Sequence, residues 1–238
     1  MHPLVHTWAR DRLSEVEQGR WVRKIAVLLA DLISWDESMS GYEFRRSLVS
    51  HATTCLQVIT PETLFSSSIG AQRCCTVAEK FARVLRESGQ WEGAMQLEEK
   101  VYKERKRTLG EEHPNTLISM NNLAGSYSDL GRRQDALQLK EKVYKTRKRT
   151  LGEEHPDTLI SMNNLAISYS DLGRRQEAVQ LQEKAYKARK RTLGEEHPDT
   201  LRMLKNYNIF LQKLHKKTQS QNKMQGSAIH TKDGNKEK

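Results

Sequence analysis

Residues 155–196 read HPDTLISMNNLAISYSDLGRRQEAVQLQEKAYKARKRTLGEE, and residues 113–154 read HPNTLISMNNLAGSYSDLGRRQDALQLKEKVYKTRKRTLGEE. The two blocks are identical at 35 of 42 positions. One period upstream, residues 71–112 form a diverged copy that ends QLEEKVYKERKRTLGEE. One period downstream, the pattern fades after HPDTLRMLKNYNIFLQ. A fixed period of this length, with atypical blocks at both ends, is the signature of a repeat array.

Each block is predicted to contain two helices. In residues 113–154 the first helix has apolar residues at helical spacing, namely Leu117, Met120, Leu123, Ala124 and Tyr127. The second has Ala136, Leu139, Val143 and Tyr144. Gly131 and Gly152 are suited to end these helices, and Pro156 to begin the next one. Neither helix buries its apolar stripe alone, so neighbouring blocks must stack, which predicts an all-α solenoid of helical hairpins.

Two recurring features of the blocks are expected to be structural. His113, His155 and His197 each precede a proline at a predicted helix start, so we interpret them as capping residues. The basic run around Arg147 lies at a helix C-terminus, where cations complement the helix dipole. This run therefore needs no ligand to explain it.

The small, aromatic and glycine positions make the blocks resemble the tetratricopeptide repeat (TPR); they are Ala124, Tyr127, Gly131 and Ala136, repeated as Ala166, Tyr169, Gly173 and Ala178. The 42-residue period, the MNNLA helix and the TLGEEHPDTL connector resemble the kinesin-light-chain type in particular. The resemblance covers residues 71–212. Leu85 replaces the tyrosine in the diverged block, and Asn208 replaces the small alanine in the last one. The resemblance implies a helical-hairpin solenoid that binds protein partners.

The opening MHPLVHTWARDRL resembles the end of the winged-helix subdomain in NB-ARC-type signalling ATPases, with Pro3 in place of the acidic residue of the MHD-like motif. Fungal proteins of that class often carry kinesin-light-chain-like repeats after this segment. The sequence has no G-x-x-x-x-G-K-[ST] motif, so His2 is not expected to contact a nucleotide. We expect the chain to be the C-terminal part of such a protein.

These observations divide the chain into seven segments. They are a winged-helix-like remnant (1–20), a helical bridging segment (21–70), a diverged repeat (71–112), two repeats (113–154 and 155–196), a capping helix (197–215) and a disordered basic tail (216–238). In the bridging segment one helix is expected to bury a face made of Trp21, Val22, Ile25, Leu28, Leu29 and Leu32. The tail is too polar to offset the entropy of ordering.

Composition excludes several classes of protein. The longest apolar run, residues 25–30, is too short to span a membrane, and no secretory signal is present. The three cysteines form neither a disulfide framework nor a zinc-binding spacing, so we expect a cytoplasmic protein with structural thiols. His2 and His6 lack a third metal ligand, and no nucleophile elbow or HExxH motif is present. We expect no catalytic residue, no metal and no cofactor.

The candidate binding site is the concave face that the first helix of each TPR hairpin lines. Its middle is predicted to consist of Asn121, Asn122, Ser128, Asn163, Asn164, Ile167 and Ser170, and its ends of Lys80, Arg83, Arg86, Arg202 and Lys205. Asparagine side chains both donate and accept hydrogen bonds, so they suit the backbone of an extended peptide. The basic ends favour an acidic peptide, because charge-assisted hydrogen bonds are strong.

Two alternative functions remain open at this stage. Nearly identical blocks with imperfect end caps suit homotypic assembly into a homo-oligomer. The RKRT stripes and the basic tail suit nucleic acid, but they lack interleaved aromatic residues and are preceded by acidic residues such as Glu98 and Glu99. We therefore favour a non-catalytic protein-binding module, the sensor or scaffold part of an NB-ARC-type signalling protein.

Overall fold

Glycine and histidine mark the helix ends in the computed structural model. Gly131 has a φ of 76°, a left-handed conformation in which its N–H bonds the carbonyl of Ser128 while that of Arg132 bonds the carbonyl of Tyr127. This pair of bonds is a Schellman motif. At the start of the same helix, Nδ1 of His113 accepts the N–H of Asn115 at 3.1 Å. His155 and His197 accept equivalent bonds, which confirms their capping role.

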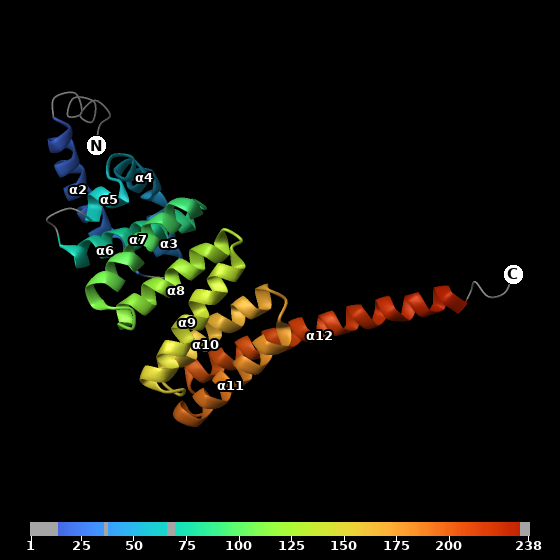
Figure 1. Ribbon diagram of the computed structural model, residues 1–238. Helices are drawn as coiled ribbons and strands as arrows, with labels where there is room; N and C mark the ends of the chain where they lie inside the picture. The colour runs from blue at the N-terminus through green and yellow to red at the C-terminus, as the bar shows by residue number, and fades with distance from the viewer. Residues whose placement is uncertain (1–13, 36–37, 66–69, 234–238) are drawn as a thin grey trace. The chain divides into compact units, whose positions relative to one another are not determined.

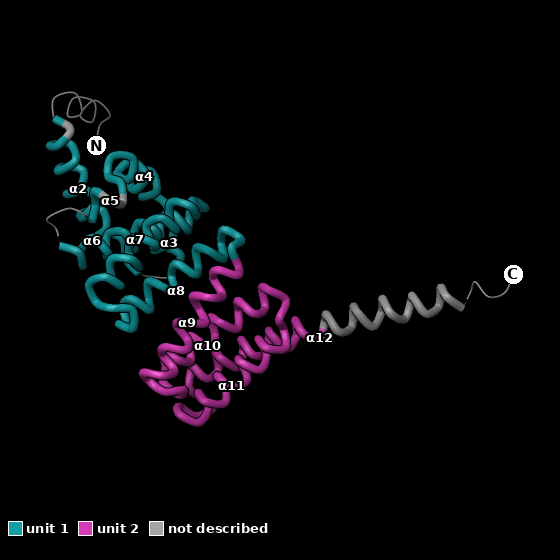
Figure 2. Tube along the Cα trace, in the orientation of Figure 1, with its two compact units in different colours: residues 1–132 teal, residues 133–238 magenta. Residues whose placement is uncertain are grey.

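The structure describes residues 14–35, 38–65 and 70–233, and the side chains of all of these except 15, 61–62 and 216–233. All its regular elements in these residues are helices (Figure 1). The chain divides into two units, residues 1–132 and residues 133–238 (Figure 2). Unit 1 contains α2 (Glu15–Leu32), α3 (Met39–Ser47), α4 (Val49–Val58), α5 (Pro61–Phe65), α6 (Ala71–Glu87), α7 (Trp91–Leu109) and α8 (Pro114–Asp129). Unit 2 contains α9 (Arg133–Leu151), α10 (Pro156–Asp171), α11 (Arg175–Leu193) and α12 (Pro198–Asp233).

Within each unit, consecutive helices pack as TPR-like hairpins. In unit 1, α7 packs on both α6 and α8, and in unit 2, α11 packs on both α10 and α12. The close approaches occur at alanines, since Ala82 and Ala94 in unit 1 and Ala166 and Ala178 in unit 2 are all fully buried. The fold is therefore the predicted all-α array of helical hairpins.

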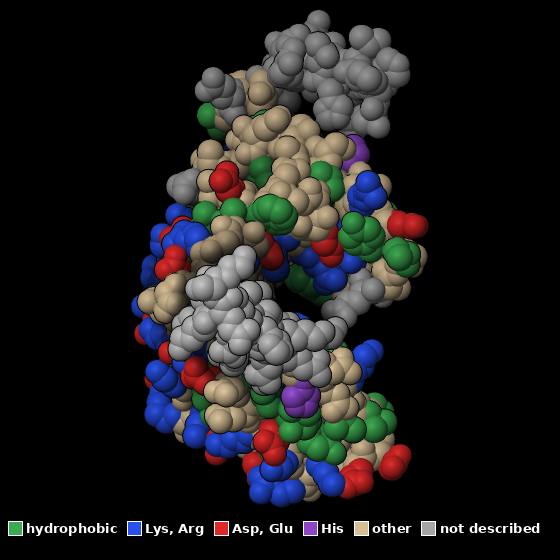
Figure 3. All heavy atoms as spheres, turned by 90° about the vertical axis from the view of Figure 1, so that its right-hand side faces the viewer, with side chains coloured by type: hydrophobic (Ala, Val, Ile, Leu, Met, Phe, Trp, Pro, Cys, Tyr) green, Lys and Arg blue, Asp and Glu red, His purple; other side chains and the backbone are tan. Residues whose placement is uncertain are grey.

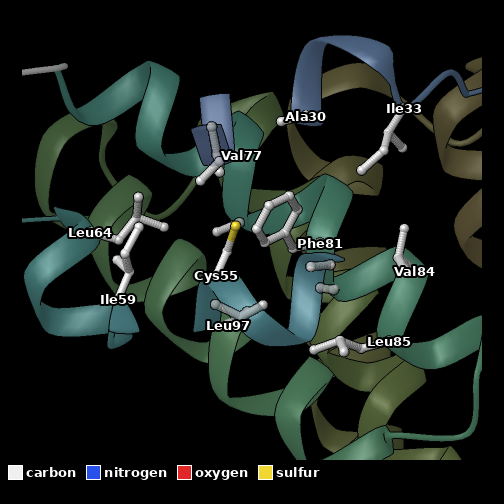
Figure 4. Close-up of a cluster of buried hydrophobic side chains, with 14 of the residues drawn as sticks. Ala30, Ile33, Cys55, Ile59, Leu64, Val77, Phe81, Val84, Leu85 and Leu97 are labelled. Carbon is white, nitrogen blue, oxygen red and sulfur yellow. The ribbon is translucent and has the colours of Figure 1, made fainter. Parts of the chain in front are cut away.

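The unit 1 core joins the bridging segment to the diverged repeat. Figure 4 shows Phe81 of α6 close to Val77, Cys55 and Leu97, with Ala30 and Ile33 nearby. Burial raises the pKa of Cys55 and of Cys75 to about 11, as expected of structural thiols. In unit 2 two smaller clusters form the core, one around Leu159 and Met162 and one around Ala166 and Phe210.

The predicted apolar face of the helix after residue 20 is partly wrong. Trp21, Leu28 and Leu32 are more than half exposed, whereas α2 buries Ala26, Ala30 and Ile33 against the unit 1 core. The prediction followed the helical spacing of the large apolar residues, whereas the small residues Ala26 and Ala30 of α2 are the ones that are fully buried. In addition, α2 begins at Glu15 and crosses the predicted boundary between residues 20 and 21. Residues 1–13, which carry the winged-helix resemblance, lie outside the described residues.

The last helix is longer than predicted. Capping was assigned to residues 197–215, yet α12 continues to Asp233. Residues 216–225 contain Lys, Gln and Met, which favour helix, and no proline follows Pro198. The side chains of residues 216–233 and all of residues 234–238 lie outside the described residues, so the disordered basic tail stays a prediction.

Candidate functional site

Unit 1 contains a cavity of about 530 Å³ between the loop after α2 and the helices α6, α7 and α8. Its lining consists of two tryptophans (Trp35, Trp91), two arginines (Arg83, Arg86), four acidic residues (Glu79, Glu87, Glu98, Asp129) and Asn122. Both tryptophans are about half exposed, at 51% and 46%. The cavity therefore combines open aromatic rings with a charged interior.

One wall of the cavity is an ion-pair cluster around Glu87. Arg45 of α3 is 2% exposed, and its Nε donates to both carboxylate oxygens of Glu87, at 2.8 and 3.1 Å. Nε of Arg83 donates to the same carboxylate at 3.0 Å. Burial alone would raise the pKa of Glu87, but these two hydrogen-bonding arginines outweigh it and lower the pKa. The guanidinium of Arg83 also lies over the ring of Trp35, 5.4 Å from its centroid.

Arg86 occupies the opposite side of the cavity, over Gly125. Its Nε donates to Asp129 at 3.1 Å, and its Nη1 lies 3.7 Å from Oε1 of Glu98. A Cβ atom at position 125 would lie 3.0 Å from Nη2 of Arg86, so glycine leaves room for the guanidinium on α8. The equivalent residue of the next repeat is Ile167. The blocks at 113–154 and 155–196 differ at only seven positions, and position 125 is one of them. The structure explains the glycine, because a larger residue would crowd the guanidinium of Arg86.

Two further carboxylates line the cavity, one half-buried (Glu79) and one buried (Glu98). Glu79 receives two hydrogen bonds from Arg105, at 2.5 and 2.8 Å. Glu98 is 4% exposed, and its Oε2 has no hydrogen-bond partner among the described residues. Burial raises the pKa of both carboxyls, against the opposing effects of Arg105 on Glu79 and of Ser126 and Arg86 on Glu98. Glu98 is therefore the least compensated acidic group of the cavity.

The structure brings together three of the predicted site residues, because Asn122, Arg83 and Arg86 all line this cavity. Lys80 does not, since its Nζ donates to the carbonyl of Ala30 at 2.8 Å and caps the end of α2. Asn121 is half-buried, and the hydroxyl of Ser128 donates to the carbonyl of Ala124 within α8. The cations at this end of the predicted groove therefore serve structural contacts of unit 1.

In unit 2 the predicted residues lie on α10 and α12. Oδ1 of Asn163 accepts hydrogen bonds from Gln182 at 2.7 Å and from Asn206 at 3.0 Å, a structural role that the sequence did not predict. Asn164 and Ser170 are half-buried, and Ile167 is 40% exposed. On α12 the side chains of Arg202 and Lys205 are exposed. Arg202 pairs with Asp199 at 3.0 Å.

The basic stripes are compensated within the chain, in part by residues of the same block and in part by residues of a neighbouring block. Lys106 pairs with Glu111 and Lys148 with Glu153, at 2.8 and 3.2 Å, and Lys190 pairs with Glu195 in the same way. Arg147 is buried and donates to the carbonyl of Asp157 and to Ser161. In Figure 3, basic and acidic side chains lie beside one another along the left edge and at the bottom of the view. The stripes therefore have partners within the chain.

Sequence reasoning missed the residues that give the cavity its character: Trp35, Trp91, Glu79 and Glu98. Trp35 belongs to the segment outside the repeats, which offered no pattern. Glu79 and Glu98 carried a signal, because they stand where the repeat at 155–196 has Asn163 and Gln182. Comparing the diverged block with its neighbours would have found them.

Within the described residues, no group of three His, Cys, Asp or Glu side chains is arranged to hold a metal ion. The helices described here also include none with the length and apolar character needed to cross a bilayer.

The hairpins match a known family. The model of the tetratricopeptide repeat matches residues 75–115, 116–157 and 158–199, more than half of the chain. The chain therefore belongs to the tetratricopeptide repeat family, whose members are typically non-catalytic protein-interaction modules. A comparison with curated proteins finds no match.

Solved structures make the assignment more specific. A Podosopora anserina protein described as a putative kinesin light chain with nearly identical TPR-like repeats has, in a single-substitution form, 28% identity and a TM-score of 0.60, over 81% of this chain and 94% of that one. A second structure of that protein has 25% identity and a TM-score of 0.59, over 82% and 95%. BtubC (BKLC) from P. vanneervenii, at 15% identity and a TM-score of 0.58 over 95% and 94%, shares the fold. The repeats are thus kinesin-light-chain-like in structure.

Proposed function

We propose that this chain binds extended peptide segments of a partner protein along the faces of its first helices. The observation that carries the proposal is the cavity of unit 1, where Asn122, Arg83 and Arg86 converge beside two exposed tryptophans. A concave site with aromatic walls and a few convergent polar groups is the usual form of a ligand-binding site. In unit 2 the ligand face is formed by Asn164, Ile167 and Ser170 of α10 together with α12.

The partner segment is proposed to be acidic. Lys205 supports this, because its exposed cation lies on α12 and attracts carboxylates. The exposed Arg202 supports it less strongly, since it pairs with Asp199. The cations of unit 1 contribute less to this preference, since Arg83 and Arg86 already pair with Glu87 and Asp129. The acidic preference therefore resides in unit 2.

We further propose that the module is the sensor or scaffold part of a cytoplasmic NB-ARC-type signalling protein. The resemblance of residues 1–20 to the end of a winged-helix subdomain, directly ahead of kinesin-light-chain-like repeats, supports this. The three free, buried cysteines accord with a reducing compartment. A tagged copy of the chain expressed in its own cells, fractionated and imaged, tests the location.

A peptide-display selection against the full chain tests binding. We expect enrichment of extended acidic peptides by the wild type, and loss of enrichment with Asn164→Ala and with the double variant Arg202→Gln/Lys205→Gln. Lys187→Gln is the matched control, because Lys187 is an exposed cation that pairs with Glu183 on α11, away from the proposed face. No enrichment by a folded wild-type chain, with size rising with concentration in light scattering, would replace this proposal with homotypic assembly.

A further inference from the structure

Three positions of the repeat carry neutral amide side chains in unit 2, whereas two of the three equivalent positions in unit 1 carry carboxylates. In unit 2 they are Asn163, Gln182 and Asn206, and the amides of the last two donate to Oδ1 of the first. These hydrogen bonds link α10, α11 and α12. We name this set the amide triad. Its members supply some of one another's hydrogen bonds. The triad therefore has a structural role that requires no ligand.

Two periods upstream, the equivalent residues are Glu79, Glu98 and Asn122, and all three line the unit 1 cavity. Ionised carboxylates accept hydrogen bonds but do not donate them, so Glu79 and Glu98 cannot form the hydrogen bonds that join the amide triad. Glu79 instead pairs with Arg105. Glu98 is left with a buried Oε2 that has no hydrogen-bond partner among the described residues. Oε1 of Gln182 has none either, but Nε2 of Gln182 donates to Asn163, and the carboxylate of Glu98 has no such donor. Unit 1 thus lacks a donor at this point.

Nearby groups of the protein do not supply the missing donor. Arg86 is held by Asp129 and reaches only the other oxygen of Glu98, at 3.7 Å. The hydroxyl of Ser126 lies near enough to lower the pKa of Glu98, yet it has no hydrogen-bond partner among the described residues. A buried acceptor without a donor costs free energy, so a ligand that brings N–H groups gains more here than at a satisfied site.

The remaining lining indicates the charge of that ligand. Four acidic residues and two arginines line the cavity. Arg45 and Arg105 lie behind Glu87 and Glu79 and neutralise these two carboxylates, which leaves Glu98 and Asp129 to share Arg86. Trp91 offers an exposed ring, and Arg83 over Trp35 shows that a guanidinium packs well against indole in this cavity.

We propose that the unit 1 cavity binds a basic side chain of the partner peptide, arginine in preference to lysine, with its N–H groups donating to the carboxylate of Glu98 and its plane against Trp91. A guanidinium is preferred because it stacks on an aromatic ring while it donates in its plane. The inference rests on the proposed function and makes it more specific: the segment that unit 1 binds carries one basic residue.

Fluorine NMR of the full chain labelled with 5-fluorotryptophan tests this. The probes are three acetylated and amidated pentapeptides, Gly-Gly-Xaa-Gly-Gly, in which Xaa is arginine, its neutral isostere citrulline, or glutamate. The arginine peptide should shift the resonances of Trp35 and Trp91, assigned with Trp35→Phe and Trp91→Phe, and leave that of Trp21 unchanged. Citrulline should weaken binding about tenfold or more, as loss of one charge-assisted interaction predicts. Equal binding of arginine and citrulline, or equal shifts with glutamate, would overturn the proposal.

Two variants test the role of Glu98. Glu98→Gln should weaken binding of the arginine peptide about tenfold. Because glutamine occupies the equivalent position 182, this variant is expected to fold, which circular dichroism checks. Glu99→Gln is the control, since Glu99 is the next residue of α7 and pairs with Lys103 outside the cavity. Unchanged affinity in Glu98→Gln would contradict the proposal.

The two proposals fail in different ways. If selected acidic peptides bind and depend on Asn164 while the arginine peptide causes no shift, the basic anchor is wrong and peptide binding stands. If neither acidic nor arginine peptides bind a folded chain, peptide binding itself is wrong.

Discussion

The helices α8 and α10 are identical at 14 of 16 positions, yet they serve different surroundings. In α10, Asn163 is bound by two amides and Ile167 is exposed. In α8, Asn122 borders a charged cavity, and Gly125 makes room for Arg86. The difference teaches that the function of a repeat helix is set by the side chains that neighbouring helices present to it, and only in part by its own sequence.

The two units also differ in how they treat buried polar groups. Unit 2 buries neutral amides that bond one another, whereas unit 1 buries carboxylates that depend on arginines. Buried charge carries a larger desolvation cost than buried amide, so unit 1 gives up stability at the cavity. Sites that bind ligands often show such local conflicts.

The largest expected effect comes from Ala166→Arg. Ala166 is fully buried between α10 and its neighbours, so a guanidinium there opens the hairpin and leaves a charge without a partner. We expect the free energy of unfolding of unit 2 to fall by about 4 kcal/mol or more. Urea denaturation followed by circular dichroism measures the loss. Ile167→Arg, one residue along and exposed, is the control and should change stability by about 0.5 kcal/mol at most.

A smaller loss of stability is expected when Gln182 of the amide triad is replaced by glutamate, the residue that unit 1 has at the equivalent position 98. Gln182→Glu removes the donor to Asn163 and places a carboxylate against its carbonyl oxygen, which should cost about 2 to 3 kcal/mol at neutral pH. Protonation restores a donor, so the loss should shrink as the pH falls. Urea unfolding at about pH 7 and about pH 4.5, on either side of the carboxyl range of a buried glutamate, tests both points. The exposed Gln180→Glu is the control, and an equal loss there would mean that the triad has no special role.

The reverse change in unit 1 should be stabilising. Glu98→Gln removes a carboxylate whose pKa is raised by burial in the folded state. The folded protein binds this proton more tightly than the unfolded chain, so the wild type loses stability as the pH rises above the ordinary carboxyl range. We expect a gain in stability at pH 7 that vanishes under acidic conditions. A lower stability at pH 7 would show that Arg86 requires the charge of Glu98.

The smallest effect should be equal in the two helices. His113→Ala and His155→Ala each remove one side-chain acceptor at a helix start, at 3.1 Å in both cases. Each should cost about 0.5 to 1 kcal/mol of stability. Amide hydrogen exchange of Asn115 and Asp157 reports the loss at each cap. Unequal losses of stability would show that α8 and α10 differ in their N-terminal caps as well as in the residues that surround them.

The sequence predicted what depends on local pattern. Apolar period, glycine stops and histidine caps specify the hairpins, and the structure confirms Gly131 and His113 in these roles. The face of α2 was predicted less well, because close packing of Ala26 and Ala30 outweighed the bulk of Trp21. Tertiary contacts decide such choices, and hydropathy alone does not contain them.

The sequence predicted which helix faces carry the candidate site residues, but it did not predict the contacts that these residues make. Period alone placed Asn122, Arg83 and Arg86 on the same side of their helices. It gave no sign that Lys80 would cap α2 or that Asn163 would bind Gln182, because both contacts join residues far apart in the sequence. The burial of Glu98 likewise follows from packing that the repeat pattern does not encode.

The pairing of each basic run with its own GEE segment has a consequence for how the array changes by duplication. Lys106 with Glu111, Lys148 with Glu153 and Lys190 with Glu195 all begin and end inside one block. A copied block therefore brings its own counter-charges and leaves no unmatched ion from these pairs at the new junction. We therefore expect such an array to tolerate a change in copy number, and the near identity of residues 113–154 and 155–196 is what duplication of a block would produce.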